Sequence, residues 1–377
     1  MRSPNETKAE LLRRAAAIGF DSCRIAPAAA PRHREQFHAW LESGFAAEMD
    51  WIGRGAEKRS DPQKVLPSAR SVIVLALNYW QGEEEKEAGG RENGRIARYA
   101  WGDDYHELME KKLRELDSFL TSAGGQQKFY VDTGPVLERD FAAEAGIGWH
   151  GKSTMLLNRQ LGTWFFLAEI FTTLELPFDP PQVARCGSCT RCIDVCPTGA
   201  ITAPHQLDSR RCISYLTIEL KGSIPLELRP MIGDRIYGCD DCLDACPWNR
   251  FAQVSREAAF SARPAVTQMR LRDFLALDEE QFRNMFRGSP IRRVKRRGFL
   301  RNVCVALGNV GTREDLPALV NAARDHEPLV AEHAVWAIAQ IKDRYRRQLV
   351  ERPGLQACLP DSLGKPDSFC KDSGSNG

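Results

Sequence analysis

Eight cysteines of this chain are spaced for iron–sulfur chemistry. Residues 186–197 read Cys-Gly-Ser-Cys-Thr-Arg-Cys-Ile-Asp-Val-Cys-Pro, the spacing C-x2-C-x2-C-x3-C-P. In this pattern three thiolates hold one [4Fe–4S] cluster, and the cysteine before proline holds the other cluster. A second run, Cys239-Asp-Asp-Cys242-Leu-Asp-Ala-Cys246-Pro, has one cysteine fewer. Two clusters need eight thiolates, the runs supply seven, and Cys212 between them is the candidate for the eighth.

The crossing of ligands between the two runs predicts two sets of cysteines. One cluster takes Cys186, Cys189, Cys192 and Cys246, and the other takes Cys196, Cys212, Cys239 and Cys242. Zinc sites favour isolated C-x2-C pairs and do not explain the ending x3-Cys-Pro. Disulfides would imply a small secreted chain. The pattern therefore predicts that electrons pass through the protein, without saying where they go.

The composition of the chain indicates what kind of protein carries these cysteines. A chain of 377 residues with 43% hydrophobic and 27% charged residues is expected to fold into two or three domains. The net charge of +2 excludes a global field for nucleic acid, so any basic patch must be local. No apolar run reaches membrane-spanning length, and the first 20 residues read as an amphipathic helix instead of an export signal. We expect a cytoplasmic protein whose cysteines stay reduced.

Residues 1–180 predict an α/β domain. Strands are expected over 71–77, 129–131 and 161–170, and helices over 105–120 and 138–145. A charged, glycine-rich stretch at 81–93 is typical of a surface loop. Asp132 follows the strand at 129–131, an edge where α/β domains place their sites. Its plainer interpretation is an Asx-turn residue that holds the next loop.

One motif in this part is expected to be a decoy. Residues 146–153, Gly-Ile-Gly-Trp-His-Gly-Lys-Ser, satisfy the phosphate-loop pattern G-x4-G-K-S. A phosphate loop follows a strand and opens a helix, so that backbone N–H groups face the phosphates. Here the preceding residues are predicted to be helical and the following ones extended. The order of the elements argues against nucleotide binding.

The C-terminal part combines a basic run with helical repeats. A helix is expected over 271–286, and seven cations follow within 287–301: Arg287, Arg292, Arg293, Lys295, Arg296, Arg297 and Arg301. Such a run is either a solvated face or a phosphate-binding surface. Residues 301–310 align with 332–341 at a period of 31, with a third helix over 314–323, which resembles HEAT repeats. Cys304 has the spacing of a core residue, residues 354–377 read as disordered, and Cys23, Cys358 and Cys370 receive no role.

Together these features resemble the epoxyqueuosine reductase family. The resemblance covers about residues 5–345 and rests on seven motifs, found at 57–59 (Glu-Lys-Arg), 99–106 (Tyr-Ala-Trp-Gly-Asp-Asp-Tyr-His), 131–139 (Val-Asp-Thr-Gly-Pro-Val-Leu-Glu-Arg), 145–149, 211–216, 237–242 and 246–249. The resemblance implies reduction of the epoxide of epoxyqueuosine to the alkene of queuosine at the tRNA wobble position. It implies cobalamin and two [4Fe–4S] clusters as cofactors. It also implies an N-terminal domain similar to the corrinoid domain of reductive dehalogenases.

The resemblance also implies roles for residues. Asp132 would protonate the departing oxygen, with its pKa raised by burial beside the corrin. Corrin contacts map to Arg59, Ala97, Asp132, Leu156 and Leu167, and no D-x-H-x-x-G stretch supplies a histidine to cobalt. The anticodon stem-loop would contact Arg292, Arg293, Lys295, Arg296, Arg297 and Arg301. We also expect an external electron donor, and a monomer because no extensive apolar surface helix stands out.

The expected fold is thus an α+β multidomain chain. Residues 1–180 form an α/β cobalamin-binding catalytic domain, 181–255 a ferredoxin-like domain with two [4Fe–4S] clusters, 256–345 a HEAT-like tRNA-binding domain, and 346–377 a disordered tail. Three alternatives stay open: a reductive dehalogenase, an electron-transfer protein docked through the repeats, and a phosphate-loop ATPase with accessory clusters. Corrin binding and activity on tRNA separate them.

Overall fold

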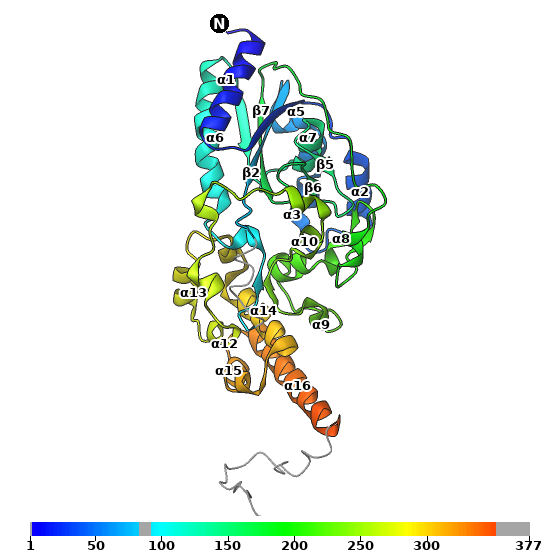
Figure 1. Cartoon of the computed structure of the whole chain (residues 1–377), viewed down its shortest axis with the longest axis vertical. Coiled ribbons are helices and arrows are strands. Elements are labelled where there is room, and N and C mark those ends of the chain that lie inside the picture. Colours follow the sequence, from blue (N-terminus) through cyan, green and yellow to red (C-terminus); the bar gives the residue numbers. More distant parts are fainter. Residues whose placement is uncertain (1, 83–91, 352–377) are drawn as a thin grey trace, which may run out of the picture.

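The computed structural model describes residues 2–82 and 92–351. Most of the predicted surface loop at 81–93 and of the predicted tail, with Cys358 and Cys370, lies outside these residues. The molecule is elongated, with a sheet and its helices at the N-terminal end, the cysteine-bearing segment in the middle and a helical array at the far end (Figure 1). The last helix continues to Glu351, past the predicted domain end at 345.

A four-stranded sheet forms the N-terminal part. Its order is β1 (Ser22–Pro27), β2 (Ser71–Asn78), β7 (Phe165–Thr172) and β4 (Gln127–Tyr130), and every neighbouring pair is antiparallel. The predicted strands are present, although β7 begins four residues later than expected. The prediction of an α/β sheet is wrong in one respect, because parallel strands are absent from this sheet. The analogy with sites of α/β domains, which lie at the ends of parallel strands, therefore does not apply to Asp132, although Asp132 does follow β4.

Helices cover both faces of this sheet, which explains why β2 is buried throughout. Ile73, Leu75 and Leu77 of β2 share a core with α1 (Pro4–Ala17) and α6 (Tyr105–Ser122). The alternate residues Val72 and Val74 pack on the other face with α5 (Pro62–Val65) and α7 (Glu138–Glu144). Since side chains of a strand alternate between faces, one apolar run serves both cores. The helices predicted over 105–120 and 138–145 are confirmed.

The elements around the phosphate-loop pattern have the predicted order, a helix before it and extended chain after it. Helix α7 precedes it, and the pattern itself runs through β5 (Trp149–His150), which pairs with β6 (Leu156–Leu157) in a small antiparallel hairpin. No helix N-terminus follows the lysine within this hairpin. The cradle that a phosphate needs is therefore absent from this described segment.

Short elements carry the cysteines and connect the two ends. They are α2 (Arg34–Glu42), α3 (Asp50–Arg54), α4 (Ala56–Ser60), α8 (Arg191–Asp194), β8 (Ile201–Ala203), β9 (Gln206–Leu207), a π-helix (Tyr215–Glu219), α9 (Arg229–Ile232), β10 (Arg235–Tyr237), α10 (Asp241–Asp244) and α11 (Pro264–Thr267). Strand β10 pairs in parallel with β3 (Arg95–Ile96). This pairing brings residues of the N-terminal part into the core of the C-terminal half. The hydrophobic cores therefore cross the predicted domain boundaries.

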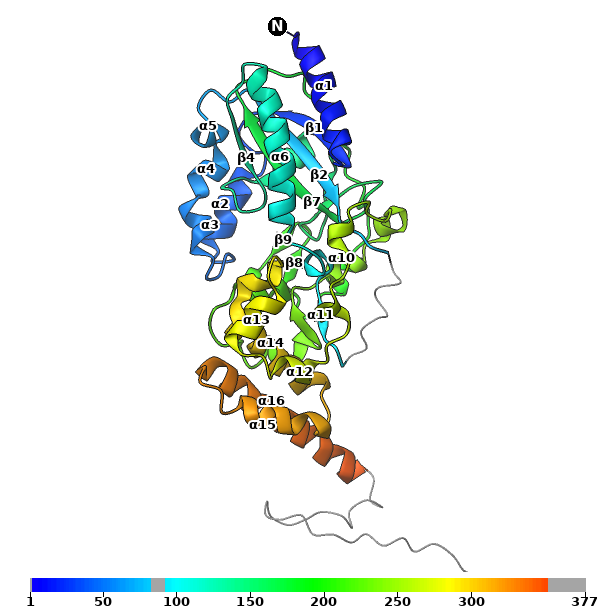
Figure 2. The same cartoon turned by 90° about the vertical axis from the view of Figure 1, so that its left-hand side faces the viewer.

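The C-terminal array is built around one buried helix, α14 (Lys295–Val310). It packs against α15 (Leu316–Ala322) and against α16 (Pro328–Glu351), as Figure 2 shows. Cys304 is fully buried there, as predicted. The helix predicted over 271–286 is divided into α12 (Leu271–Phe274) and α13 (Glu279–Met285). The division follows from Asp278, whose carboxylate caps α13 in a capping box with Gln281.

Candidate active site

The structure gathers the eight cysteines around two cavities. A cavity of about 230 Å³ is lined by Cys186, Cys189, Cys192 and Cys246, and Cys242 also borders it. A larger space of about 1120 Å³, here called the central cavity, is lined by Cys196, Cys212, Cys239 and Cys242. These are the two groups that the spacing predicts. All eight cysteines are free thiols.

The chemistry of the gathered thiols is that of a metal-cluster site. Burial and then the neighbouring thiols raise the pKa of Cys242 well above its ordinary value. Burial likewise raises the pKa of Cys246 to about 11. Gathered thiolates repel one another unless a cation shares them, and iron supplies that charge. The donor sets are therefore suited to two [4Fe–4S] clusters.

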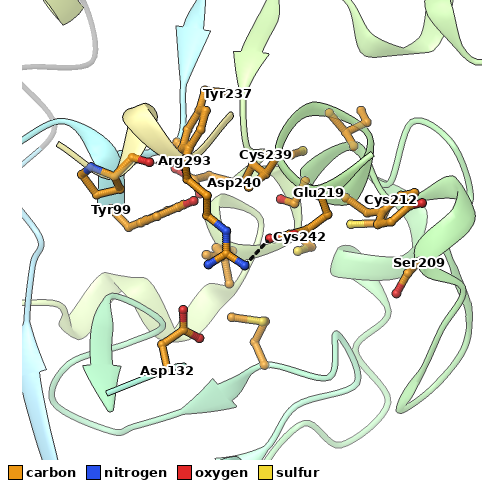
Figure 3. Close-up of a pocket in the computed structure, with 18 of the residues that line it drawn as sticks. Tyr99, Asp132, Ser209, Cys212, Glu219, Tyr237, Cys239, Asp240, Cys242 and Arg293 are labelled. Atoms are coloured by element: carbon orange, nitrogen blue, oxygen red, sulfur yellow. Dashed lines mark hydrogen bonds and ion pairs between the residues drawn. The ribbon is translucent and has the colours of Figure 1, made fainter. Parts of the chain in front are cut away.

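Asp132 stands in the wall of the central cavity, opposite Cys242 (Figure 3). Its backbone has φ +57°, in the left-handed region, at the turn after β4. Buried Arg59 holds this loop through hydrogen bonds to the carbonyls of Gly134 (2.8 Å) and Val136 (3.3 Å). Arg59 thus supports the backbone of the loop that carries Asp132.

Two side chains from the start of α6 contact the carboxylate of Asp132. The hydroxyl of Tyr105 donates to Oδ2 at 2.8 Å, and Nε2 of His106 lies 3.6 Å from the same oxygen. Asp104 caps α6 and also contacts Nδ1 of His106 at 2.8 Å. His106 therefore lies between two carboxylates, Asp104 and Asp132.

These contacts decide where the proton rests. Burial alone would raise the pKa of Asp132, but the contacts with His106 and Tyr105 outweigh it and hold this pKa below its ordinary value. Burial opposes the charge on His106, yet Asp104 and Asp132 raise its pKa to about 9. The predicted rise in the pKa of Asp132 requires burial beside the corrin, and the protein's own contacts act in the opposite direction. Near neutral pH the proton is on the imidazole and the carboxylate is ionised.

A buried carboxyl pair lies behind Asp132. Burial raises the pKa of Glu138 to about 7 and the pKa of Glu169 well above its ordinary value, and the negative charge of a neighbouring carboxylate adds to each shift. Glu169, on β7, is fully buried. Sequence reasoning missed Tyr105, His106, Glu138 and Glu169. The first three lie inside the motifs at 99–106 and 131–139, which pointed to the region without assigning them roles.

The predicted corrin contacts divide into two groups. Ala97 and Asp132 line the central cavity. Arg59, Leu156 and Leu167 are not among its lining residues. Arg59 lies under the Asp132 loop, and the two leucines pack in the core on the other face of the sheet. The remaining walls are largely aromatic and apolar, with Tyr79, Tyr99, Met155, Phe165, Phe166, Ile218 and Tyr237.

The basic run divides in the same way. Arg292, Arg293 and Lys295 line the central cavity, and Arg297 is exposed. The guanidinium of Arg293 forms an ion pair with Glu219 at 2.8 Å and reaches into the cavity (Figure 3).

The prediction that Arg296 and Arg301 contact tRNA is wrong, because both are buried. Arg296 pairs with Asp325 at 2.6 Å. Arg301 is fully buried and donates to the carbonyls of Leu216, Leu220 and Gly222. Burial also lowers the pKa of Arg301 to about 10. Arg301 therefore holds the array to the cysteine-bearing segment, whereas Arg296 joins parts of the C-terminal half.

A search of the described helices for membrane spans finds none with the length and apolar character to cross a bilayer.

The structure has two cysteine groups, and one of them lines the cavity that also contains Asp132. These features define an oxidoreductase of the two-cluster iron–sulfur class. Residues 185–249 match the family of 4Fe-4S double cluster binding domains, and residues 59–133 match the family Epoxyqueuosine reductase QueG, DUF1730. The epoxyqueuosine reductase of Xanthomonas campestris is 43% identical over 343 residues, which cover 89% of this chain and 97% of that protein. The chain belongs to the epoxyqueuosine reductase family.

Other relatives agree with this assignment. The epoxyqueuosine reductase of Escherichia coli K12 is 41% identical over 339 residues, with 89% of each chain covered. A crystal structure of an epoxyqueuosine reductase with an epoxyqueuosine-modified tRNA-Tyr stem loop has a TM-score of 0.85 and 32% identity, covering 93% of this chain and 94% of that one. The Bacillus subtilis enzyme, captured with its aspartate catalytic loop swung out of the active site, has a TM-score of 0.83 and 31% identity, with the same coverage.

Proposed function

We propose that this chain reduces the epoxide of epoxyqueuosine in tRNA to the alkene of queuosine. The reaction takes up two electrons and two protons, breaks both C–O bonds of the epoxide and releases its oxygen as water. One observation carries the proposal: the central cavity is lined by a cysteine group and also by Asp132. Electrons and protons would therefore arrive in the same space.

The cysteine groups would hold two [4Fe–4S] clusters in series. Cys186, Cys189, Cys192 and Cys246 would bind the one away from the central cavity, and Cys196, Cys212, Cys239 and Cys242 the one beside it. Cys242 borders both cavities, so the clusters would lie next to each other. An external donor would pass electrons singly through them.

Cobalamin would occupy the central cavity. Sites for drug-sized ligands usually measure about 300–1,000 Å³, and the cavity of about 1120 Å³ exceeds them. Its aromatic and apolar walls suit the flat face of a corrin, and Ala97, Asp132, Tyr99 and Phe166 are the candidates to contact it. When bound, cobalamin supplies a low-potential metal centre that collects single electrons for a two-electron reduction.

Asp132 would deliver a proton to the departing oxygen. A cofactor and substrate that fill the cavity remove water from the carboxylate, and this favours its protonated form. His106, 3.6 Å away, is charged at neutral pH and would supply that proton. Tyr105 would orient the carboxylate through its hydrogen bond. In this proposal Asp132 is the donor and His106 the proton source.

The cations at the cavity would hold the anticodon stem-loop. Four exposed cations lie in the turn before α14 and in its first residues: Arg292, Arg293, Lys295 and Arg297. A relative of this family binds an epoxyqueuosine-modified tRNA stem loop. Phosphate contacts at this place would bring the wobble base to the cavity. We propose that α14–α16 form a HEAT-like array in a tRNA-binding domain over 256–345, after domains at 1–180 and 181–255. An enzyme of this kind would act in the cytoplasm.

The test is an anaerobic assay on the reconstituted protein. It is incubated with cobalamin, a strong reductant and tRNA that contains epoxyqueuosine, and the digested nucleosides are weighed by mass spectrometry. Loss of one oxygen mass that depends on cobalamin supports the proposal. Intact clusters and bound corrin without this loss would point to another corrinoid substrate. Absence of corrin binding would leave an electron-transfer module.

A further inference from the structure

Three side chains that the proposed reaction does not use meet outside both cavities. They are His33, before α2, Asp140 on α7 and His150 on β5. Nδ1 of His33 lies 2.8 Å from Oδ1 of Asp140, and Nε2 of His150 lies 2.9 Å from the same oxygen. All three ligand atoms lie within 4.8 Å of one another. None of these residues lines the central cavity or the smaller cysteine cavity.

The contact between His150 and Asp140 has the distance of a hydrogen bond but not its direction. Nε2 of His150 is buried, and no hydrogen-bond partner reaches it among the described residues. Two ligands of one ion, each bonded at about 2.0–2.1 Å, can approach each other to 2.9 Å. The ring nitrogen then points at the ion, roughly 45° away from the line to the oxygen. An off-axis approach of this kind is compatible with a cation that both atoms share.

We propose that His33, Asp140 and His150 bind one divalent first-row metal ion, with zinc as the probe of choice. Two imidazole nitrogens and one carboxylate oxygen are a ligand set that zinc and its neighbours accept. The buried Asp140 is held in place by the backbone N–H of His33, which donates to its second oxygen at 2.9 Å. The three ligands therefore come from separate segments of the chain, and the carboxylate of Asp140 contacts both histidines.

The position of the ion defines its role as structural. Asp140 follows the Asp132 loop by eight residues. Lys152, two residues after His150, donates to the carbonyls of Gly187 and Cys189 in the first cysteine run. An ion at this place would tie the segment before α2 to α7 and to the β5–β6 hairpin. It would stiffen the frame between the Asp132 loop and the first cluster without touching the reacting atoms.

The experiment uses the holoprotein with both clusters assembled and iron content measured. Zinc is titrated in competition with a chromophoric chelator, and X-ray absorption at the zinc edge reports the ligands. We expect one zinc per chain with a nitrogen and oxygen shell at about 2.0–2.1 Å. A sulfur shell at about 2.3 Å, which would mean zinc on the cysteines, overturns the proposal.

The variant His150→Gln tests the site directly, and Asp140→Asn is a second variant. We expect His150→Gln to weaken zinc binding at least about tenfold and to remove the rise in melting temperature that zinc gives the wild type. His38→Gln is the matched control, because His38 is an exposed histidine of α2 whose ring contacts Ser60. Iron content should be unchanged in all variants. Zinc affinity equal to that of the wild type in His150→Gln would overturn the site.

Discussion

Asp132 is the residue on which the proposed chemistry depends most. Asp132→Asn keeps the size and the hydrogen bond from Tyr105 but cannot donate a carboxyl proton. We expect turnover of epoxyqueuosine in tRNA to fall about 10²–10⁴-fold, with iron content and tRNA affinity unchanged. Glu115→Gln, on the exposed face of α6, is the control and should behave as the wild type. Full turnover by Asp132→Asn would remove Asp132 from the role of proton donor.

His106 makes the reaction depend on pH. Its folded-state pKa of about 9 lies above the ordinary value of 6.5, so the ion pair stabilises the protein below about pH 6.5, and this stabilisation is lost as the pH rises through about 9. We expect turnover to fall along an alkaline limb near pH 9 in the wild type. His106→Gln should lower the rate near neutral pH and remove this limb. A limb that persists in the variant would assign it to another group.

Strand β7 carries a buried acid whose effect on stability also has a definite sign. The pKa of Glu169 is raised above its ordinary value of 4.5, so the folded state keeps a proton that the unfolded state releases. Stability therefore falls as the pH rises above about 4.5. Glu169→Gln removes this dependence. The melting temperature of the variant minus that of the wild type should therefore increase between about pH 5 and pH 8. Parallel pH profiles for the two proteins would contradict the shift.

Helix α14 and the turn before it carry exposed arginines, Arg292 and Arg297, and buried arginines, Arg296 and Arg301. We expect the double variant Arg292→Gln/Arg297→Gln to weaken tRNA binding and to reduce the slope of log affinity against log salt by up to about 2. Arg114→Gln, exposed on α6, is the control. Filter binding across several salt concentrations measures both. An unchanged slope would place the phosphate contacts elsewhere.

Substitution of the buried Arg301 should lower stability and leave the salt dependence of tRNA binding unchanged. Arg301→Gln leaves the carbonyls of Leu216, Leu220 and Gly222 without their buried donor. Unpaired buried polar groups are costly, so we expect the melting temperature to fall by about 5 °C or more. At temperatures where this variant is folded, its salt slope for tRNA should equal that of the wild type. A reduced slope with normal stability would restore Arg301 as a phosphate contact.

At the scale of the whole molecule, local patterns predicted well and long-range relations did not. The cysteine groups, β2 and α6 were readable because spacing along the chain carries their geometry. The direction of strand pairing depends on partners that lie 39–101 residues apart, and the prediction of an α/β sheet missed it. Arg301 looked like part of a basic surface, since its carbonyl partners lie 79–85 residues away. The pKa of Asp132 depends on Tyr105 and His106, which no rule of local sequence connects to it.

The arrangement of the molecule predicts a separation between electron supply and tRNA binding. Cys212 and the cations Arg292, Arg293 and Lys295 line the same central cavity, but only the cysteine belongs to a cluster-binding group. We expect Cys212→Ser to lower iron from about eight to about four atoms per chain, to abolish turnover and to leave tRNA affinity within about twofold. Cys23→Ser, in β1 and away from both cavities, should keep all the iron. Turnover by a Cys212→Ser protein with a single cluster would show that electrons reach the cavity by another route, because the cluster beside the cavity is the last step in the proposed series.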